Sequence, residues 1–171
     1  MSGLVVGGKP PGLDDLLVRE IMTAAPVSIG EDESFMAAWE RMTARGVHHL
    51  PVTDRDGRYR GMVDATRLAA TWPGGGPEQA HRPVSVLLRD RRFPRVRVGD
   101  PVRTVAAAMV AARADAVAVT AAGGHLAGIV TVRDLLIAFT RGGAAGREQR
   151  PDGVRRGPGA AYHPGSRPPR P

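Results

Sequence analysis

Thr131 and Asp134 are the two side chains of this sequence best placed to do chemistry. They stand three residues apart directly after the apolar run Gly128-Ile129-Val130, where a strand is expected to turn into a helix. A hydroxyl and a carboxylate at this spacing form a near capping box, in which the two residues satisfy each other's free groups. A helix start also attracts an anion, and a carboxylate is an acceptor that suits ligand hydroxyls. The pair is therefore a helix cap, a ligand site, or both.

The signature that contains this pair occurs twice. Gly61-Met62-Val63-Asp64-Ala65-Thr66-Arg67-Leu68 is echoed 67 positions later by Gly128-Ile129-Val130-Thr131-Val132-Arg133-Asp134-Leu135. Each copy closes a stretch of about 50 residues, and a duplicated unit of this size is one supersecondary module that cannot bury its apolar face alone. The sequence therefore predicts two similar units that pack together.

Apolar spacing and turn residues predict six elements in the first copy. Leu13, Leu16, Leu17 and Ile21 have helical spacing, and Thr23-Ala24-Ala25-Pro26 breaks that pattern. The predicted elements are a helix over 13–22, a strand over 27–29, a helix over 35–45, strands over 49–53 and 61–63, and a helix over 65–72.

The second copy follows the same plan. After an opening segment over 84–88 and a strand over 96–98, Asp100-Pro101 begins a helix, because Asp caps free N–H groups and Pro suits the first turn. The later elements are a helix over 102–112, strands over 116–120 and 129–130, and a closing helix with Leu135, Leu136 and Phe139 on its apolar face.

Composition divides the chain into five parts. These are a loose N-terminal arm over 1–12, a first repeat over 13–72, a linker over 73–82, a second repeat over 83–140 and a tail over 141–171. The run Trp72-Pro73-Gly74-Gly75-Gly76-Pro77, typical of loops, joins the end of the first repeat to the linker. The tail is rich in Arg, Gly and Pro and has few large apolar groups, so it is expected to be disordered.

Charge and composition exclude several classes of protein. The formal net charge is +7, but seven Arg against Glu148 and Asp152 place most of it in the tail. No apolar run approaches the ~18–20 residues of a membrane span, and no cysteine is available for disulfides. No secretory signal is recognisable at the N-terminus. A cytoplasmic protein is therefore expected.

The ordered motifs resemble the cystathionine β-synthase (CBS) domain. The residues that carry the resemblance are Arg19-Glu20-Ile21-Met22-Thr23, Pro26-Val27, Val47-His48-His49-Leu50-Pro51-Val52-Thr53-Asp54, Gly57 and Gly61-Met62-Val63, and residues 95–136 are similar to a second such domain. The resemblance implies an α+β fold of two βαββα units, packed through their sheets with pseudo-twofold symmetry into a Bateman module. It also implies a homodimer and a regulatory role without catalysis.

Family resemblance further implies a ligand, since the clefts of such pairs bind adenine nucleotides or adenosyl compounds. The pattern from Gly128 to Asp134 matches the family in full, so Thr131 would contact phosphate or ribose and Asp134 the ribose hydroxyls. Arg133 either supplies charge to a phosphate or is simply solvated. The remaining predicted ligand-binding residues, on two strands of the second repeat, are Val96, Ala116 and Val117. The expected ligands are AMP, ADP, ATP or S-adenosylmethionine, none of them a required cofactor.

The first copy departs from this pattern. Asp64 stands where a hydroxyl is expected and Arg67 where the ribose-binding carboxylate is expected. Asp64 can still cap a helix, but it would repel a phosphate, and Arg67 offers no acceptor to a ribose. We therefore expect a degenerate first cleft, empty or repurposed, and a working second cleft.

Other functions find less support in the sequence. His48-His49 does not predict a metal site, because adjacent strand residues point to opposite faces, and no nucleophile–base spacing indicates an enzyme. The alternative is a ligand-free dimerisation or interaction protein whose basic tail contacts an acidic partner or nucleic acid. Tyr162 is the tail's only aromatic residue, so stacking on bases is not expected. The regulated protein is unknown.

Overall fold

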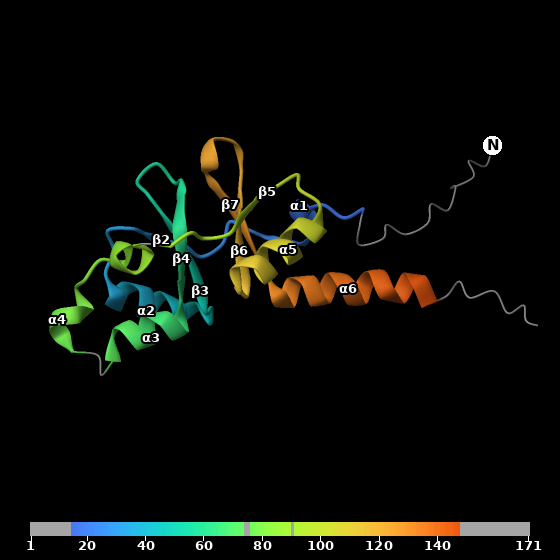
Figure 1. Cartoon of the computed structure of the whole chain (residues 1–171). Coiled ribbons are helices and arrows are strands. Elements are labelled where there is room, and N and C mark those ends of the chain that lie inside the picture. Colours follow the sequence, from blue (N-terminus) through green and yellow to red (C-terminus); the bar gives the residue numbers. More distant parts are fainter. Residues whose placement is uncertain (1–14, 74–75, 90, 148–171) are drawn as a thin grey trace, which may run out of the picture.

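A computed structural model describes residues 15–73, 76–89 and 91–147 (Figure 1). The predicted α+β fold of two repeats is confirmed, with one small mixed sheet in each repeat. The elements up to the end of the first repeat are α1 (Val18–Ile21), β1 (Thr23–Ala24), β2 (Ile29–Gly30), α2 (Phe35–Arg45), β3 (His49–Thr53), β4 (Tyr59–Asp64) and α3 (Ala65–Thr71).

The second half of the chain repeats this order. Its elements are α4 (Pro77–Ala80), the 3-10 helix η2 (Val84–Leu88), β5 (Arg95–Arg97), α5 (Val102–Ala112), β6 (Ala116–Thr120), the short 3-10 turn η3 (Ala122–Gly124), β7 (Leu126–Thr131) and α6 (Val132–Arg147). Figure 1 shows the hairpins β3–β4 and β6–β7 side by side, with α2 and α3 on the first sheet and α5 and α6 beside the second.

Each sheet has the same core topology. In the first sheet, in the order β2-β3-β4, β2 runs parallel to β3, and β3 pairs antiparallel with β4. In the second sheet, in the order β1-β7-β6-β5, β5 is parallel to β6 and β6 is antiparallel to β7. Both repeats are therefore βαββα units, and the strand β1 is an addition from outside the second repeat.

The core has two helix–sheet layers and a shared layer between the sheets. Phe35, Ala38 and Met42 of α2 pack against the first sheet, and Val105 and Met109 of α5 occupy the same place on the second. The shared layer contains Tyr59, Met62, Ala116, Ala118 and Ile129. Neither sheet could bury this shared face alone, so the two repeats depend on each other for stability.

The segment before each repeat packs on the opposite repeat. Val18 N donates to Asp100 O at 2.9 Å, and Val102 N donates to Leu16 O at 2.9 Å. The matching bonds in the other direction join Val84 N to Glu33 O at 2.8 Å and Phe35 N to Arg82 O at 3.0 Å. These two sets follow the pseudo-twofold symmetry of the pair. We call residues 16–24 and 82–88 the leader segments.

Packing of the leader segments explains where the sequence predictions of structure fail. The predicted helix over 13–22 is wrong in extent: among its described residues, 15–22, only Val18–Ile21 is helical, because the Leu16 carbonyl accepts from Val102 and not from its own helix. Thr23–Ala24, predicted only as a break, is a strand that pairs with β7. The first-repeat strand lies at Ile29–Gly30, and not over 27–29.

Two helices lie within or extend across the predicted parts of the chain. The linker over 73–82 contains the helix α4, whose Ala80 is buried against the first repeat. Helix α6 continues to Arg147, past the predicted end of the second repeat at residue 140. The predicted arm over 1–12 and the tail beyond residue 147 lie outside the described residues.

The two signature glycines are required because a leader segment crosses each of them. A Cβ on Gly128 would lie 2.7 Å from Met22 Sδ and 3.0 Å from the Thr23 carbonyl oxygen. A Cβ on Gly61 would lie 2.7 Å from Leu88 Cδ2 and 2.8 Å from the Phe93 ring. A side chain at Gly128 would therefore collide with the backbone of the leader segment, and one at Gly61 would collide with the Leu88 and Phe93 side chains.

We predict that Gly128→Ala lowers the free energy of unfolding by about 1–3 kcal/mol, the usual effect of overpacking. The added methyl group meets the Thr23 backbone, which cannot move without breaking the β1–β7 pairing. Urea denaturation would measure the change, with Gly99→Ala as the control because nothing lies within 4 Å of a Cβ at Gly99. An equal free energy of unfolding in the two variants would show that Gly128 has room for a methyl group beneath the leader segment.

Candidate functional site

The predicted cap at the end of β7 is present. Thr131 N and Thr131 Oγ1 both donate to Asp134 Oδ2 at 2.8 Å, and Asp134 N donates to Thr131 Oγ1 at 3.4 Å. The two side chains thus satisfy each other's polar groups at the start of α6, as a capping box requires. Both bonds from Thr131 reach Oδ2, and within the described residues no hydrogen bond reaches Asp134 Oδ1. One carboxylate oxygen therefore remains for a ligand.

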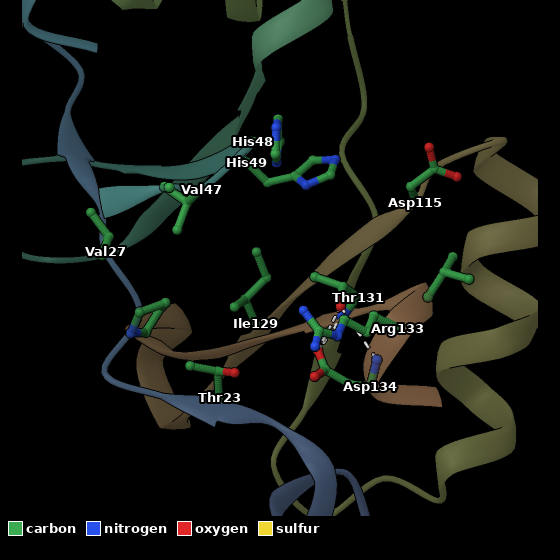
Figure 2. A pocket seen from close by; sticks show the side chains of 13 residues that line it. Thr23, Val27, Val47, His48, His49, Asp115, Ile129, Thr131, Arg133 and Asp134 are labelled. Atoms are coloured by element: carbon green, nitrogen blue, oxygen red, sulfur yellow. Dashed lines mark hydrogen bonds between the residues drawn. The ribbon is translucent and has the colours of Figure 1, made fainter. Parts of the chain in front are cut away.

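This cap lines a cleft between the two repeats, which we call the second cleft. Its volume is about 560 Å³, within the range of small-molecule sites. Figure 2 shows His48 and His49 on the opposite side of the cleft from Thr131, Arg133 and Asp134. The other lining residues, from the leader segment and from both sheets, are Thr23, Pro26, Val27, Gly46, Val47, Asp115, Ile129 and Val132.

Three of the predicted ligand-binding residues lie elsewhere. Val96 and Val117 are only 4% and 0% exposed and belong to the core of the second repeat, so they cannot reach the second cleft. Ala116 faces the shared layer and lines the other cleft. The structure therefore does not bring these three residues to the wall that holds Thr131 and Asp134.

Residues 46–49 and Val27 form the wall that sequence reasoning missed. The pseudo-twofold symmetry could have predicted these residues from the sequence. Because the repeats pack on each other, the strand opposite Thr131 comes from the other repeat. At the offset of 67 that relates the two signatures, residues 46–49 correspond to residues 113–116, which line the other cleft from residue 113 onward. Each cleft therefore combines one repeat's signature with the other repeat's central strand.

The first cleft has this composite structure as well. It has a volume of about 540 Å³ and combines the signature residues Asp64, Ala65 and Thr66 with residues 112–116 of the second repeat. Asp64 caps α3 as predicted, because its Oδ1 accepts from Arg67 N at 2.7 Å. The Arg67 side chain is not among the lining residues.

His49 lies between the two clefts and lines both of them. Burial lowers the pKa of His49, while the nearby carboxylates of Asp64 and Asp115 act in the opposite direction without cancelling the effect. The imidazole is therefore neutral at pH 7. Among the described residues, no group of three or more His, Asp or Glu side chains could hold a metal ion.

Known proteins identify the family of this chain. Residues 18–71 and 88–141 each match the model of the CBS domain, and together they make up more than half of the sequence. The chain therefore belongs to the CBS domain family and contains a tandem CBS pair. No curated protein matches the chain. No helix of the described part is long and apolar enough to cross a membrane.

Solved structures share this fold at low sequence identity. Hypoxic Response Protein I, solved with two coordinated zinc ions, is 22% identical, with a TM-score of 0.64 over 71% of this chain and 98% of that chain. The CBS domain pair of protein MJ0100, in complex with 5′-methylthioadenosine and S-adenosyl-L-methionine, is 23% identical, with a TM-score of 0.63 over 74% and 97%. A putative acetoin utilization protein (AcuB) from Vibrio cholerae is 20% identical, with a TM-score of 0.66 over 80% and 98%.

We predict that stability falls as the pH drops through the ordinary His pKa of about 6.5, and that His49 contributes to this fall. The pKa of His49 is lowered in the folded state, so the unfolded chain takes up the proton first and gains free energy relative to the native state. Urea denaturation at pH 7.5 and pH 5.5 would measure the effect.

His49→Gln should reduce the difference in unfolding free energy between the two pH values relative to the wild-type chain. An unchanged difference in His49→Gln would mean that this imidazole does not titrate differently in the two states.

Proposed function

We propose that this protein is a regulatory CBS pair that binds an adenine nucleotide or another adenosyl ligand in the second cleft. The observation that carries the proposal is the position of Thr131 and Asp134 on one wall of a cleft between the two repeats. The adenosyl compounds bound by the MJ0100 pair support the class of ligand.

The second cleft has one apolar side and one polar end. Pro26, Val27, Val47 and Ile129 provide apolar surface suited to an adenine ring. The free Oδ1 of Asp134 can accept a ribose hydroxyl without breaking the cap. The start of the long helix α6, next to the exposed Arg133, suits a phosphate or carboxylate group.

Regulation follows from the composite wall of this site. A ligand in the second cleft contacts both repeats and thus favours the arrangement of the pair in which the two walls are correctly spaced. Such differential affinity is sufficient to shift a population between two arrangements. The proposed role is therefore sensing rather than catalysis, with a regulated protein of unknown identity.

A second candidate is a ligand-free interaction protein. Thr131 and Asp134 already satisfy each other, so their presence is explained without a ligand. In that account the basic tail, outside the described residues, contacts an acidic partner or nucleic acid. Ligand titration separates the two candidates.

We predict that isothermal titration calorimetry detects stoichiometric binding of AMP, ADP, ATP or S-adenosylmethionine, and that Asp134→Asn weakens it about tenfold or more. The amide keeps one acceptor for the cap but loses the charge, and hydrogen bonds to charged groups are each worth about 1.5–3 kcal/mol. Asp64→Asn, at the cap of the first repeat, is the matched control and should retain binding. Silence across all four ligands would favour the interaction protein.

We also propose a homodimer. Leu136 and Phe139 of α6 are each 61% exposed, and Trp39 of α2 is also exposed. Exposed apolar groups of this size are typical of an interface. A second copy of the chain would cover them.

We predict that Leu136→Lys with Phe139→Lys converts the dimer to a monomer, because two charges would be buried at the interface without partners. Sedimentation velocity would measure the molecular mass of both proteins. A wild-type chain that sediments as a monomer at micromolar concentration would contradict the proposed homodimer.

A further inference from the structure

The first cleft has a chemical character of its own. Three arginines, Arg91, Arg92 and Arg113, line it together with the Phe93 ring. Two carboxylates, Asp64 and Asp115, and the two imidazoles of His48 and His49 complete the set of charged and titratable groups on its walls. The second cleft contains one arginine, Arg133.

Within the part of the chain that the structure describes, the arginines of the first cleft form no ion pair with a carboxylate. Within the described residues, the ion pairs are formed by Arg41 with Glu33, Arg55 with Asp32 and Arg60 with Glu31. None of them involves Arg91, Arg92 or Arg113. Arg91 stacks over the Phe93 ring at 5.6 Å, a contact that orients its guanidinium group without balancing its charge.

A fourth arginine adds a buried donor. The Nε of Arg67, in the first turn of α3, is buried and has no hydrogen-bond partner within the described residues. Burial, and then the positive charge of Arg91, lower the pKa of Arg67. The Arg67 side chain does not line the first cleft, so it adds positive charge behind the wall and makes no contact with a ligand there.

Arg113 has a left-handed backbone conformation, which is unusual for a residue with a side chain. Arg113 ends α5 in the left-handed region with φ of 49°, and the equivalent residue at the end of α2 is Gly46 with φ of 60°. A residue with a Cβ is disfavoured in this conformation and glycine is not. Strained positions of this kind cluster at functional sites, and this one places an arginine on the wall of the first cleft.

We propose that the first cleft binds a compact polyanion with two or three linked phosphoryl groups, held by Arg91, Arg92 and Arg113. The planar fork of a guanidinium group matches phosphate oxygens bidentately. The three arginines outnumber Asp64 and Asp115, so the walls carry a net positive charge, whose attraction grows with the number of negative charges on the ligand. No carboxylate stands at position 67 to bind a ribose, so recognition is of the phosphates alone and the two clefts take different ligands.

Titration of the full chain with inorganic tripolyphosphate tests this proposal, and sodium sulfate at equal ionic strength is the control for simple charge screening. Arg91→Gln with Arg92→Gln should weaken tripolyphosphate binding at least tenfold. Arg155→Gln with Arg156→Gln removes an adjacent arginine pair from the C-terminal segment and should leave the affinity unchanged. An equal loss in both double variants, or equal binding of sulfate, would overturn the proposal.

Arg113→Gly provides a second, independent variant. It should raise the melting temperature, because glycine relieves the left-handed conformation, and at the same time weaken tripolyphosphate binding. Stabilisation with unchanged affinity would contradict a binding role for Arg113.

Competition experiments with adenosine and ATP show which part of a ligand the first cleft recognises. ATP should compete with tripolyphosphate at the first cleft, and adenosine should not. Asp134→Asn tests the second cleft separately and should retain tripolyphosphate binding, so the failure of either site can be recognised on its own. Competition by adenosine would overturn recognition through phosphates alone.

Discussion

The reciprocal packing of the leader segments is the constraint on which the rest of this structure depends. Val18 completes the core of the second repeat, while Val84 and Leu87 complete the core of the first. Full burial of each such side chain stabilises the fold by about 1.5–3 kcal/mol. The leader segments pass so close to Gly61 and Gly128 that a Cβ atom has no room at either position. Each repeat is thus stable only as half of a pair.

Composite clefts follow directly from this exchange. With the repeats joined through the shared layer, the end of one signature faces the central strand of the other repeat, and both clefts are built this way. His49 lines both clefts, so a ligand that moves His49 in one cleft also changes the wall of the other. The two clefts nevertheless differ in chemistry, since Thr131 and Asp134 line one and three arginines line the other.

Much of this fold could be predicted from the sequence, because its signals are local. Hydrophobic alternation, turn residues and the repeated signature give the order of elements, and the spacing of Thr131 and Asp134 gives the cap. Local signals cannot reveal which segments of one repeat contact the other repeat. Residues 13–22 have helical spacing, yet the loop before α5 takes the backbone bonds that a longer helix needs. The surroundings of Val96, Ala116 and Val117 are likewise decided by which faces of the sheets meet.

The central claim is that the second cleft is one ligand site built by two repeats. Amide chemical shifts of the isotope-labelled chain, recorded during titration with S-adenosylmethionine and with ATP, test it most directly. The account predicts that one of these ligands shifts the signals of residues 131–134 and of residues 47–49 together, with a single affinity. Shifts confined to one of the two segments, or absent from both, would contradict it.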